Sequence, residues 1–232
     1  AMSPAVVLIC ANAMPSGFMD PFSRKPAGGG RPSPRLANFP FPGIVPSMPR
    51  SLYDRDYLLL NASNFLYSLY ATMFIFLPPF LYRLGVREGE IGLIMATGTL
   101  VSVALKPVNG LFVDRGGRTA FLVSGALLAS ASTVPWLFVT EPGAHLFAIR
   151  IFQGAAYSFF ATASYAYIAA AAPADRRGEA LGVFGLSFFL PTAIGGWLGE
   201  WVIGRSGFQG LFLSATVIAF LAALFPLGMR EP

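Results

Sequence analysis

Residues 110–118 place one carboxylate among arginines and glycines between two long apolar runs. The residues of this segment that could serve a function are Gly110, Asp114, Arg115, Gly117 and Arg118. The carboxylate can meet arginines or the N-terminus of a helix, while the first glycine allows close approach of a neighbouring helix. The later glycines let the chain reverse in a very short connection. A generic basic turn is the alternative, but it requires neither the acid nor this glycine spacing.

A second polar group lies inside an apolar run and consists of Arg150, Gln153 and Gly154. An arginine within a membrane-spanning segment costs about 3 kcal/mol on insertion scales, so its guanidinium should face protein or water. Because Arg150 is about one turn from the end of its run, it could instead extend to the membrane surface. The neighbouring glutamine and glycine favour a functional polar network.

The first apolar run carries four polar residues that recur every three positions and so follow one helical face. They are Asn61, Asn64, Tyr67 and Tyr70. Amides and phenols are costly in lipid without partners, so this face should line either a solute cavity or an adjoining helix. Both alternatives stay open. Lys106 could likewise extend to the cytoplasmic surface or attract anions from a central cavity.

The composition argues against several other functions. The single cysteine, Cys10, and the single histidine, His145, rule out a metal cluster of these residues, and we expect no cofactor. We find no phosphate-binding glycine loop and no run of basic residues interleaved with aromatic ones, so nucleic acid is not an expected partner. An intramembrane enzyme would need acids, histidine or serine that converge within the apolar runs, and only Glu200 is acidic near a run's interior.

Long apolar runs must position these groups. The chain has a mean hydropathy of +0.62, with 55% hydrophobic and 12% charged residues, whereas soluble domains carry about 25% charge. A helix of about 20 apolar residues crosses a bilayer, and it satisfies its own backbone there. We therefore expect an all-α membrane protein with six transmembrane helices. The six runs are residues 57–82, 91–113, 119–140, 145–174, 180–199 and 206–229. In the fifth run, Gly195 and Gly199 predict tight helix packing.

Residues 1–50 differ from the bundle expected at 51–232. Ten of the nineteen prolines lie in this segment, so we expect a disordered, proline-rich leader. Lysine and arginine are also unevenly divided, with eleven before the first run, in the even-numbered turns and at the C-terminal end against three in the odd-numbered turns. This bias predicts a multi-pass protein of the inner cell membrane with both termini in the cytoplasm.

The pattern Gly-x-x-x-Asp-Arg-x-Gly-Arg at 110–118 resembles the signature loop between the second and third helices of the major facilitator superfamily. Arg-x-x-Gln-Gly at 150–154 resembles a second signature of that family, in its fourth helix. The order of the motifs, their helices and their sides of the membrane all agree. The resemblance covers about residues 52–230 and implies one six-helix half of a twelve-helix transporter.

The resemblance also implies roles for single residues. Gly110 and Asp114 would face a helix of the other half and help to lock the outward-open state. Arg118 would pair with an acid after the fourth helix, for which Asp175 is the candidate. Arg150 would belong to the polar network that links protonation to helix movement.

Together, these features predict ion-coupled secondary active transport of a small solute by alternating access. The chain would be an N-terminal half or fragment, and a second six-helix bundle, either a missing C-terminal half or another copy, would be its partner in the bilayer. One alternative is a half-transporter that serves as a structural or assembly partner without transport. An intramembrane enzyme is a further, disfavoured alternative.

Overall fold

The computed structural model describes residues 53–173 and 176–231, with the side chain of Asp114 left out. The leader predicted at residues 1–50 lies outside these described residues. Within the described part every regular element is a helix, as expected for a chain that must satisfy its backbone in lipid.

The first membrane segment is a helix with a short tightened turn. It consists of α2 (Arg55–Met73), the 3-10 turn η2 (Phe74–Phe76) and α3 (Leu77–Arg83). Pro78 lies in the first turn of α3, where a missing N–H is tolerated because it has no partner within the helix. Gly85 then adopts a φ of +83°, which ends the segment in a conformation that favours glycine.

The next three helices form two short reversals. They are α4 (Glu88–Gly116), α5 (Arg118–Thr133), which continues into η3 (Val134–Phe138), and α6 (His145–Ala171). Only Gly117, with a φ of +89°, separates α4 from α5. The predicted glycine reversal is therefore confirmed, and it is even tighter than a conventional loop.

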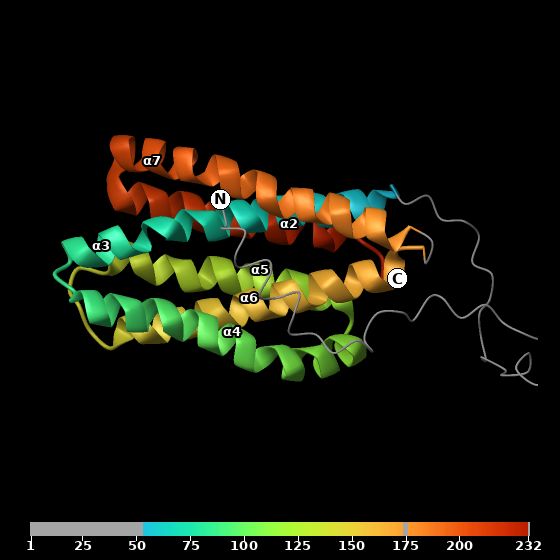
Figure 1. The fold of residues 1–232 in the computed structure, drawn as a ribbon, viewed down its shortest axis with the longest axis horizontal. Coiled ribbons are helices and arrows are strands. Elements are labelled where there is room, and N and C mark those ends of the chain that lie inside the picture. The colour runs from blue at the N-terminus through green and yellow to red at the C-terminus, as the bar shows by residue number, and fades with distance from the viewer. Residues whose placement is uncertain (1–52, 174–175, 232) are drawn as a thin grey trace, which may run out of the picture. The chain divides into compact units, whose positions relative to one another are not determined.

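The last long helix, α7 (Arg177–Leu224), breaks at Gly207 and is followed by η4 (Pro226–Gly228). Gly207 has φ 67° and ψ −169°, a combination that is open essentially to glycine alone. The break divides α7 into two helical arms, 177–206 and 208–224, and Figure 1 shows the second arm folded back along the first. The first arm therefore continues beyond the predicted end of the fifth run at Gly199.

Five helical segments of the described part are long and apolar enough to cross a membrane. They are Arg55–Arg83, Glu88–Val113, Arg118–Phe138, His145–Ala171 and Arg177–Gly228. The first four correspond to the first four predicted runs. The fifth contains both remaining runs, joined through the break at Gly207.

The helix α2 lies beside α7 (Figure 1), and hydrogen bonds connect it to both arms of α7. The Tyr57 hydroxyl donates to the Ala180 carbonyl at 2.9 Å in the first arm, and the Ser63 hydroxyl donates to the Ala222 carbonyl at 2.8 Å in the second. On the other side, α4 and α5 both pack against α6.

A Cβ atom at Gly195 would lie 2.7 Å from Thr72 Cγ2, and one at Gly199 would collide with the Phe76 ring. The tight packing predicted at these glycines is confirmed.

Candidate functional site

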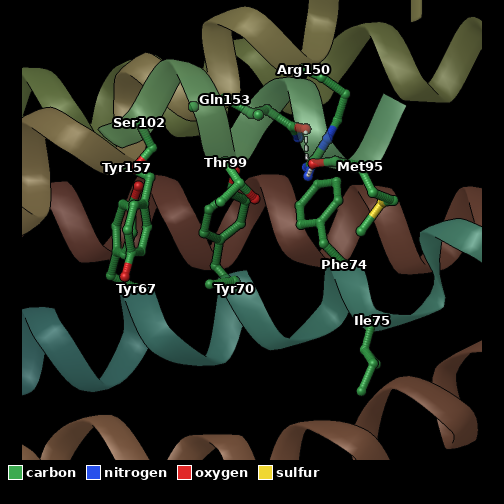
Figure 2. Close-up of a pocket in the computed structure, with 13 residues that line it drawn as sticks. Tyr67, Tyr70, Phe74, Ile75, Met95, Thr99, Ser102, Arg150, Gln153 and Tyr157 are labelled. Atoms are coloured by element: carbon green, nitrogen blue, oxygen red, sulfur yellow. Dashed lines mark hydrogen bonds between the residues drawn. The ribbon is translucent and has the colours of Figure 1, made fainter. Parts of the chain in front are cut away.

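A cavity of about 440 Å³ lies among α2, α4 and α6. Figure 2 shows the tyrosines of α2 directed toward the polar residues of α4 and α6. The residues that line it are Tyr67, Tyr70, Ala71, Phe74, Ile75, Met95, Gly98, Thr99, Ser102, Arg150, Gln153, Gly154 and Tyr157. The cavity therefore contains all three residues of the Arg-x-x-Gln-Gly motif.

The Arg150 side chain reaches across from α6 to the backbone of α4. Its Nε donates to the Ile94 carbonyl at 3.4 Å, and its Nη2 donates to the Met95 carbonyl at 3.3 Å. Its Nη1 donates to Gln153 Oε1 at 3.1 Å, which Figure 2 marks with a dashed line. A carbonyl oxygen in a helix has a second lone pair for such a bond. Arg150 is thus held at the cavity wall by contacts within the protein.

Gly154 is required by the close approach of α4 and α6. A Cβ atom there would collide with the Gly98 carbonyl oxygen and would lie 3.0 Å from the Gly98 carbonyl carbon. Gly98 is restricted in turn, because its own Cβ would lie 3.0 Å from Arg150 Nη2. The motif therefore has a geometric cause. Glycine brings the helices together, arginine bridges them, and glutamine orients the arginine from the next turn of α6.

Aromatic rings form the α2 side of the cavity. Tyr67 is 3% exposed and stacks on Phe160, with ring centroids 3.8 Å apart and planes 4° apart. Tyr67 and Tyr70 meet edge to face at 5.4 Å. The Tyr70 hydroxyl also accepts a hydrogen bond from Thr133 Oγ1 at 3.4 Å. Both tyrosines are fixed by packing and present a preorganised wall.

The other candidate solute-facing residues lie elsewhere. Asn64 donates to Ser187 Oγ at 2.8 Å and so connects α2 to α7, which corresponds to the alternative of an interhelical hydrogen bond. Asn61 donates to the Tyr57 carbonyl within its own helix at 2.8 Å, and its Oδ1 is buried without a partner in the described structure. Lys106 is exposed and does not line the cavity.

The signature turn lies at the junction of α4 and α5. Arg115 is exposed, and nothing lies within 4 Å of the Cβ position of Gly110, so a neighbouring helix has room to approach there. The roles predicted for the Asp114 carboxylate and for Asp175 lie outside the described residues and side chains. Arg118 Nε is buried and has no hydrogen-bond partner in the described part, so its predicted ion pair stays a prediction.

An acid that the sequence reasoning missed caps this turn. Glu231 accepts hydrogen bonds from the backbone N–H of Arg118 at 3.1 Å and of Thr119 at 2.7 Å. Gly117 occupies the N-cap position and has no side chain with which to cap α5, so Glu231 supplies the carboxylate that helix N-termini favour. Adjacent Arg230 is also held, because its carbonyl accepts from the Tyr167 hydroxyl at 2.8 Å.

We expect Glu231→Ala to destabilise the bundle by about 1 kcal/mol, the usual loss when a helix cap is removed. Thermal unfolding of the purified chain in detergent would measure this change. Glu141→Ala is the matched control, since Glu141 is exposed in the loop before α6. Equal unfolding temperatures for the two variants would show that the cap contributes nothing.

The connection into α7 contains an ion pair. Arg176 Nη2 lies 2.7 Å from Glu179 Oε1, and Arg176 Nε donates to Glu179 Oε2 at 2.9 Å. The Tyr53 hydroxyl donates to the same carboxylate at 2.9 Å, and this hydrogen bond raises the pKa of Tyr53. The group joins the start of α7 to the residues just before α2, on the same side as the signature turn.

Comparison with known proteins places these motifs in a family. The model of the Major Facilitator Superfamily matches residues 59–232. The chain is 34% identical over 141 residues to an uncharacterized MFS-type transporter of Methanocaldococcus jannaschii, which covers 61% of this chain and 36% of that protein. It is 30% identical over 120 residues to the inner membrane transport protein YajR of Escherichia coli, a match that covers 52% of this chain and 26% of that protein.

A third relative is a multi-drug resistance efflux pump PmrA homolog of Lactococcus lactis, 28% identical over 172 residues, covering 69% of this chain and 40% of that protein. The chain thus spans roughly a quarter to two fifths of the length of the curated relatives it matches. Their names are those of transport proteins, in agreement with the prediction of a transporter rather than an enzyme. With a family match over most of its length, two signature motifs and apolar helices of membrane-spanning length, this chain belongs to the major facilitator superfamily.

Proposed function

We propose that this chain is one half of a secondary active transporter that moves a small solute across a cell membrane by alternating access. The observation that carries the proposal is the position of Arg150 in the cavity among α2, α4 and α6. A charged side chain at membrane depth marks a solute or ion pathway by default. The relatives named above as transporters support the same assignment.

In the proposed arrangement the two arms of α7 are the fifth and sixth spans. Each helical segment then crosses the bilayer once, and both termini lie on the cytoplasmic side of an inner membrane. The distribution of arginine supports this orientation, because Arg115 and Arg118 flank one end of the bundle whereas Arg205 lies near the opposite reversal at Gly207.

A second six-helix bundle is the proposed partner. The cavity is open rather than enclosed, and only 22% of an apolar stretch of α4 is buried within the described structure. An open cavity that contains the Arg150 guanidinium cannot face lipid cheaply, which supports a protein neighbour there. Alternating access also requires two bundles that rock about a shared site. Gly110 and Asp114 would meet that bundle, and Arg118 would pair with Asp175 as the family resemblance implies.

Arg150, Gln153 and Gly154 are the proposed coupling network. The Arg150 bonds to the α4 carbonyls offer a physical route, because a change of charge near Arg150 would change how firmly α6 holds α4. Ion coupling through this network would respond to the proton gradient across the membrane.

Reconstitution of the chain together with its second six-helix bundle into proteoliposomes tests the proposal. Uptake of a panel of labelled organic acids, amines and neutral sugars would be measured with and without an imposed pH gradient, against empty vesicles. We expect accumulation of at least one solute to depend on the gradient. Uptake equal to that of empty vesicles for the whole panel would contradict the proposal, and it would favour a structural role for the chain.

We expect Asp114→Asn to slow that uptake about tenfold, which corresponds to loss of one charge-assisted hydrogen bond between bundles. The neutral amide keeps the size of the side chain and removes its charge. Asp54→Asn is the control on the same side of the bundle, because Asp54 is exposed and makes no side-chain cap bond. Unchanged uptake kinetics in Asp114→Asn would refute the role of this carboxylate.

A further inference from the structure

The cavity offers more hydrogen-bond donors than the protein uses. The Arg150 guanidinium has five N–H groups, and the structure accounts for three of them. One N–H on each terminal nitrogen is left over. The side-chain nitrogen of Gln153 is also buried, and it has no hydrogen-bond partner in the described structure. The Tyr70 hydroxyl lies near it. Figure 2 shows the Arg150 and Gln153 side chains next to each other, so these unused donors lie together.

The same cavity has no carboxylate to balance the guanidinium. Among the described residues that line it, the side chains are aromatic, aliphatic, small, amide or hydroxyl-bearing, and none is acidic. A guanidinium in a low-dielectric site without a counter-charge is costly. An incoming anion would remove that cost and would also accept hydrogen bonds from the unused donors.

The remaining walls suit a flat apolar body. Tyr67, Tyr70, Phe74 and Tyr157 all line the cavity, and aromatic rings stack favourably on other flat groups. The volume of about 440 Å³ falls within the roughly 300–1,000 Å³ of typical small-molecule sites. Aromatic faces also attract cations, but the positive charge of Arg150 opposes a cation in the same space.

We propose that this cavity binds small organic anions, with a carboxylate on Arg150 and Gln153 and an aromatic or flat apolar body against the wall that the tyrosines form. The inference rests on the proposed function, because it takes this cavity as the solute site, and it adds the chemical class of the solute. Charge selects the ligand through the arginine, and the aromatic wall selects for shape.

Three probes that share one ring system test the charge preference. They are 2-naphthoate, naphthalene-2-methanol and 2-naphthylmethylammonium, which are negative, neutral and positive at pH 7. Their binding to the full chain in lipid nanodiscs would be measured by equilibrium dialysis, with empty nanodiscs to subtract partition into lipid. We expect 2-naphthoate to bind about ten- to a hundredfold more tightly than the other two, as one or two charge-assisted hydrogen bonds would provide.

Variants assign that preference to Arg150. Arg150→Gln should remove it, and Arg150→Lys should retain part of it, because lysine keeps the charge without the two-pronged geometry. Arg205→Gln is the matched control, since the Arg205 guanidinium lies over the Trp201 ring at 4.5 Å and outside the cavity. This control should bind 2-naphthoate as the unaltered chain does.

The charge series on the unaltered chain decides the proposal even if a variant fails to fold. Equal or tighter binding of the amine, or no 2-naphthoate binding above empty nanodiscs, overturns the inference. Binding of 2-naphthoate without uptake into proteoliposomes would keep the inference and overturn the proposed transport. Gradient-driven uptake of a cation without 2-naphthoate binding would overturn the inference and keep transport.

Discussion

Gly154→Ala is expected to destabilise the bundle by about 1–3 kcal/mol, the usual result of overpacking a tight contact. The added methyl group would meet backbone atoms of Gly98, and backbone has no rotamer with which to move aside. The helices α4 and α6 must therefore separate, which also releases the Arg150 bonds to α4. We expect a lower unfolding temperature in detergent and a loss of solute uptake.

Gly185→Ala is the matched control for this change. It makes the same substitution inside a helix, but nothing lies within 4 Å of its Cβ position. Alanine has the higher helix propensity by about 1 kcal/mol, so this variant should be at least as stable as the unaltered chain. If Gly154→Ala unfolds at the same temperature as Gly185→Ala, the close approach of α4 and α6 is not what requires Gly154.

Arg150→Leu should reduce solute uptake more than tenfold while it changes stability little. The substitution removes a charge-assisted donor set, worth about 1.5–3 kcal/mol per bond to a bound solute. Stability should respond differently, because a buried charge carries a desolvation penalty that leucine does not. The carbonyls of Ile94 and Met95 keep their bonds within α4, and only Gln153 Oε1 loses its partner.

The comparison variant is Arg83→Leu, at an exposed arginine whose guanidinium lies 5.1 Å from the centre of the Phe208 ring. Uptake and unfolding temperature would be measured for both variants in the same preparation. Arg150→Leu with normal uptake would show that Arg150 only holds two helices together, and its role in the solute site would be wrong.

Hydropathy located the first four membrane segments closely because each is a long apolar run with charges at both ends. The last two runs were separated less accurately. Single charges at Glu200 and Arg205 suggested a turn after Gly199, yet a helix tolerates isolated charges near the membrane surface. The chain reverses at Gly207 instead, where the backbone adopts a conformation that glycine alone readily takes.

At the site, contacts between residues close in sequence could be predicted, whereas contacts between distant residues could not. Arg150 and Gln153 are three residues apart on one helix, so spacing alone predicted that they would meet. The partner of Asn64, Ser187, lies 123 residues further along the chain, and no local pattern indicates it. Glu231 lies 112 residues beyond Thr119 and accepts a hydrogen bond from the backbone N–H of that residue. A search for acids that follow the last helix could have suggested a cap, but not which helix it would serve.

The cavity geometry favours Tyr67 and Tyr70 over Asn61, Asn64 and Lys106 as solute contacts. The structure thus narrows the set of candidate residues that the sequence proposed.

Accessibility of Thr99 tests most directly whether the cavity serves a transporter. Thr99 lines the cavity and is exposed, and Cys10 is the single native cysteine, so Thr99→Cys in a Cys10→Ser background gives one reporter thiol. A membrane-impermeant maleimide would be added to right-side-out and to inside-out vesicles that contain the chain together with its second bundle, with and without a pH gradient. Alternating access predicts that the thiol reacts from each side under some condition, whereas reaction from one side only, under every condition, would contradict it.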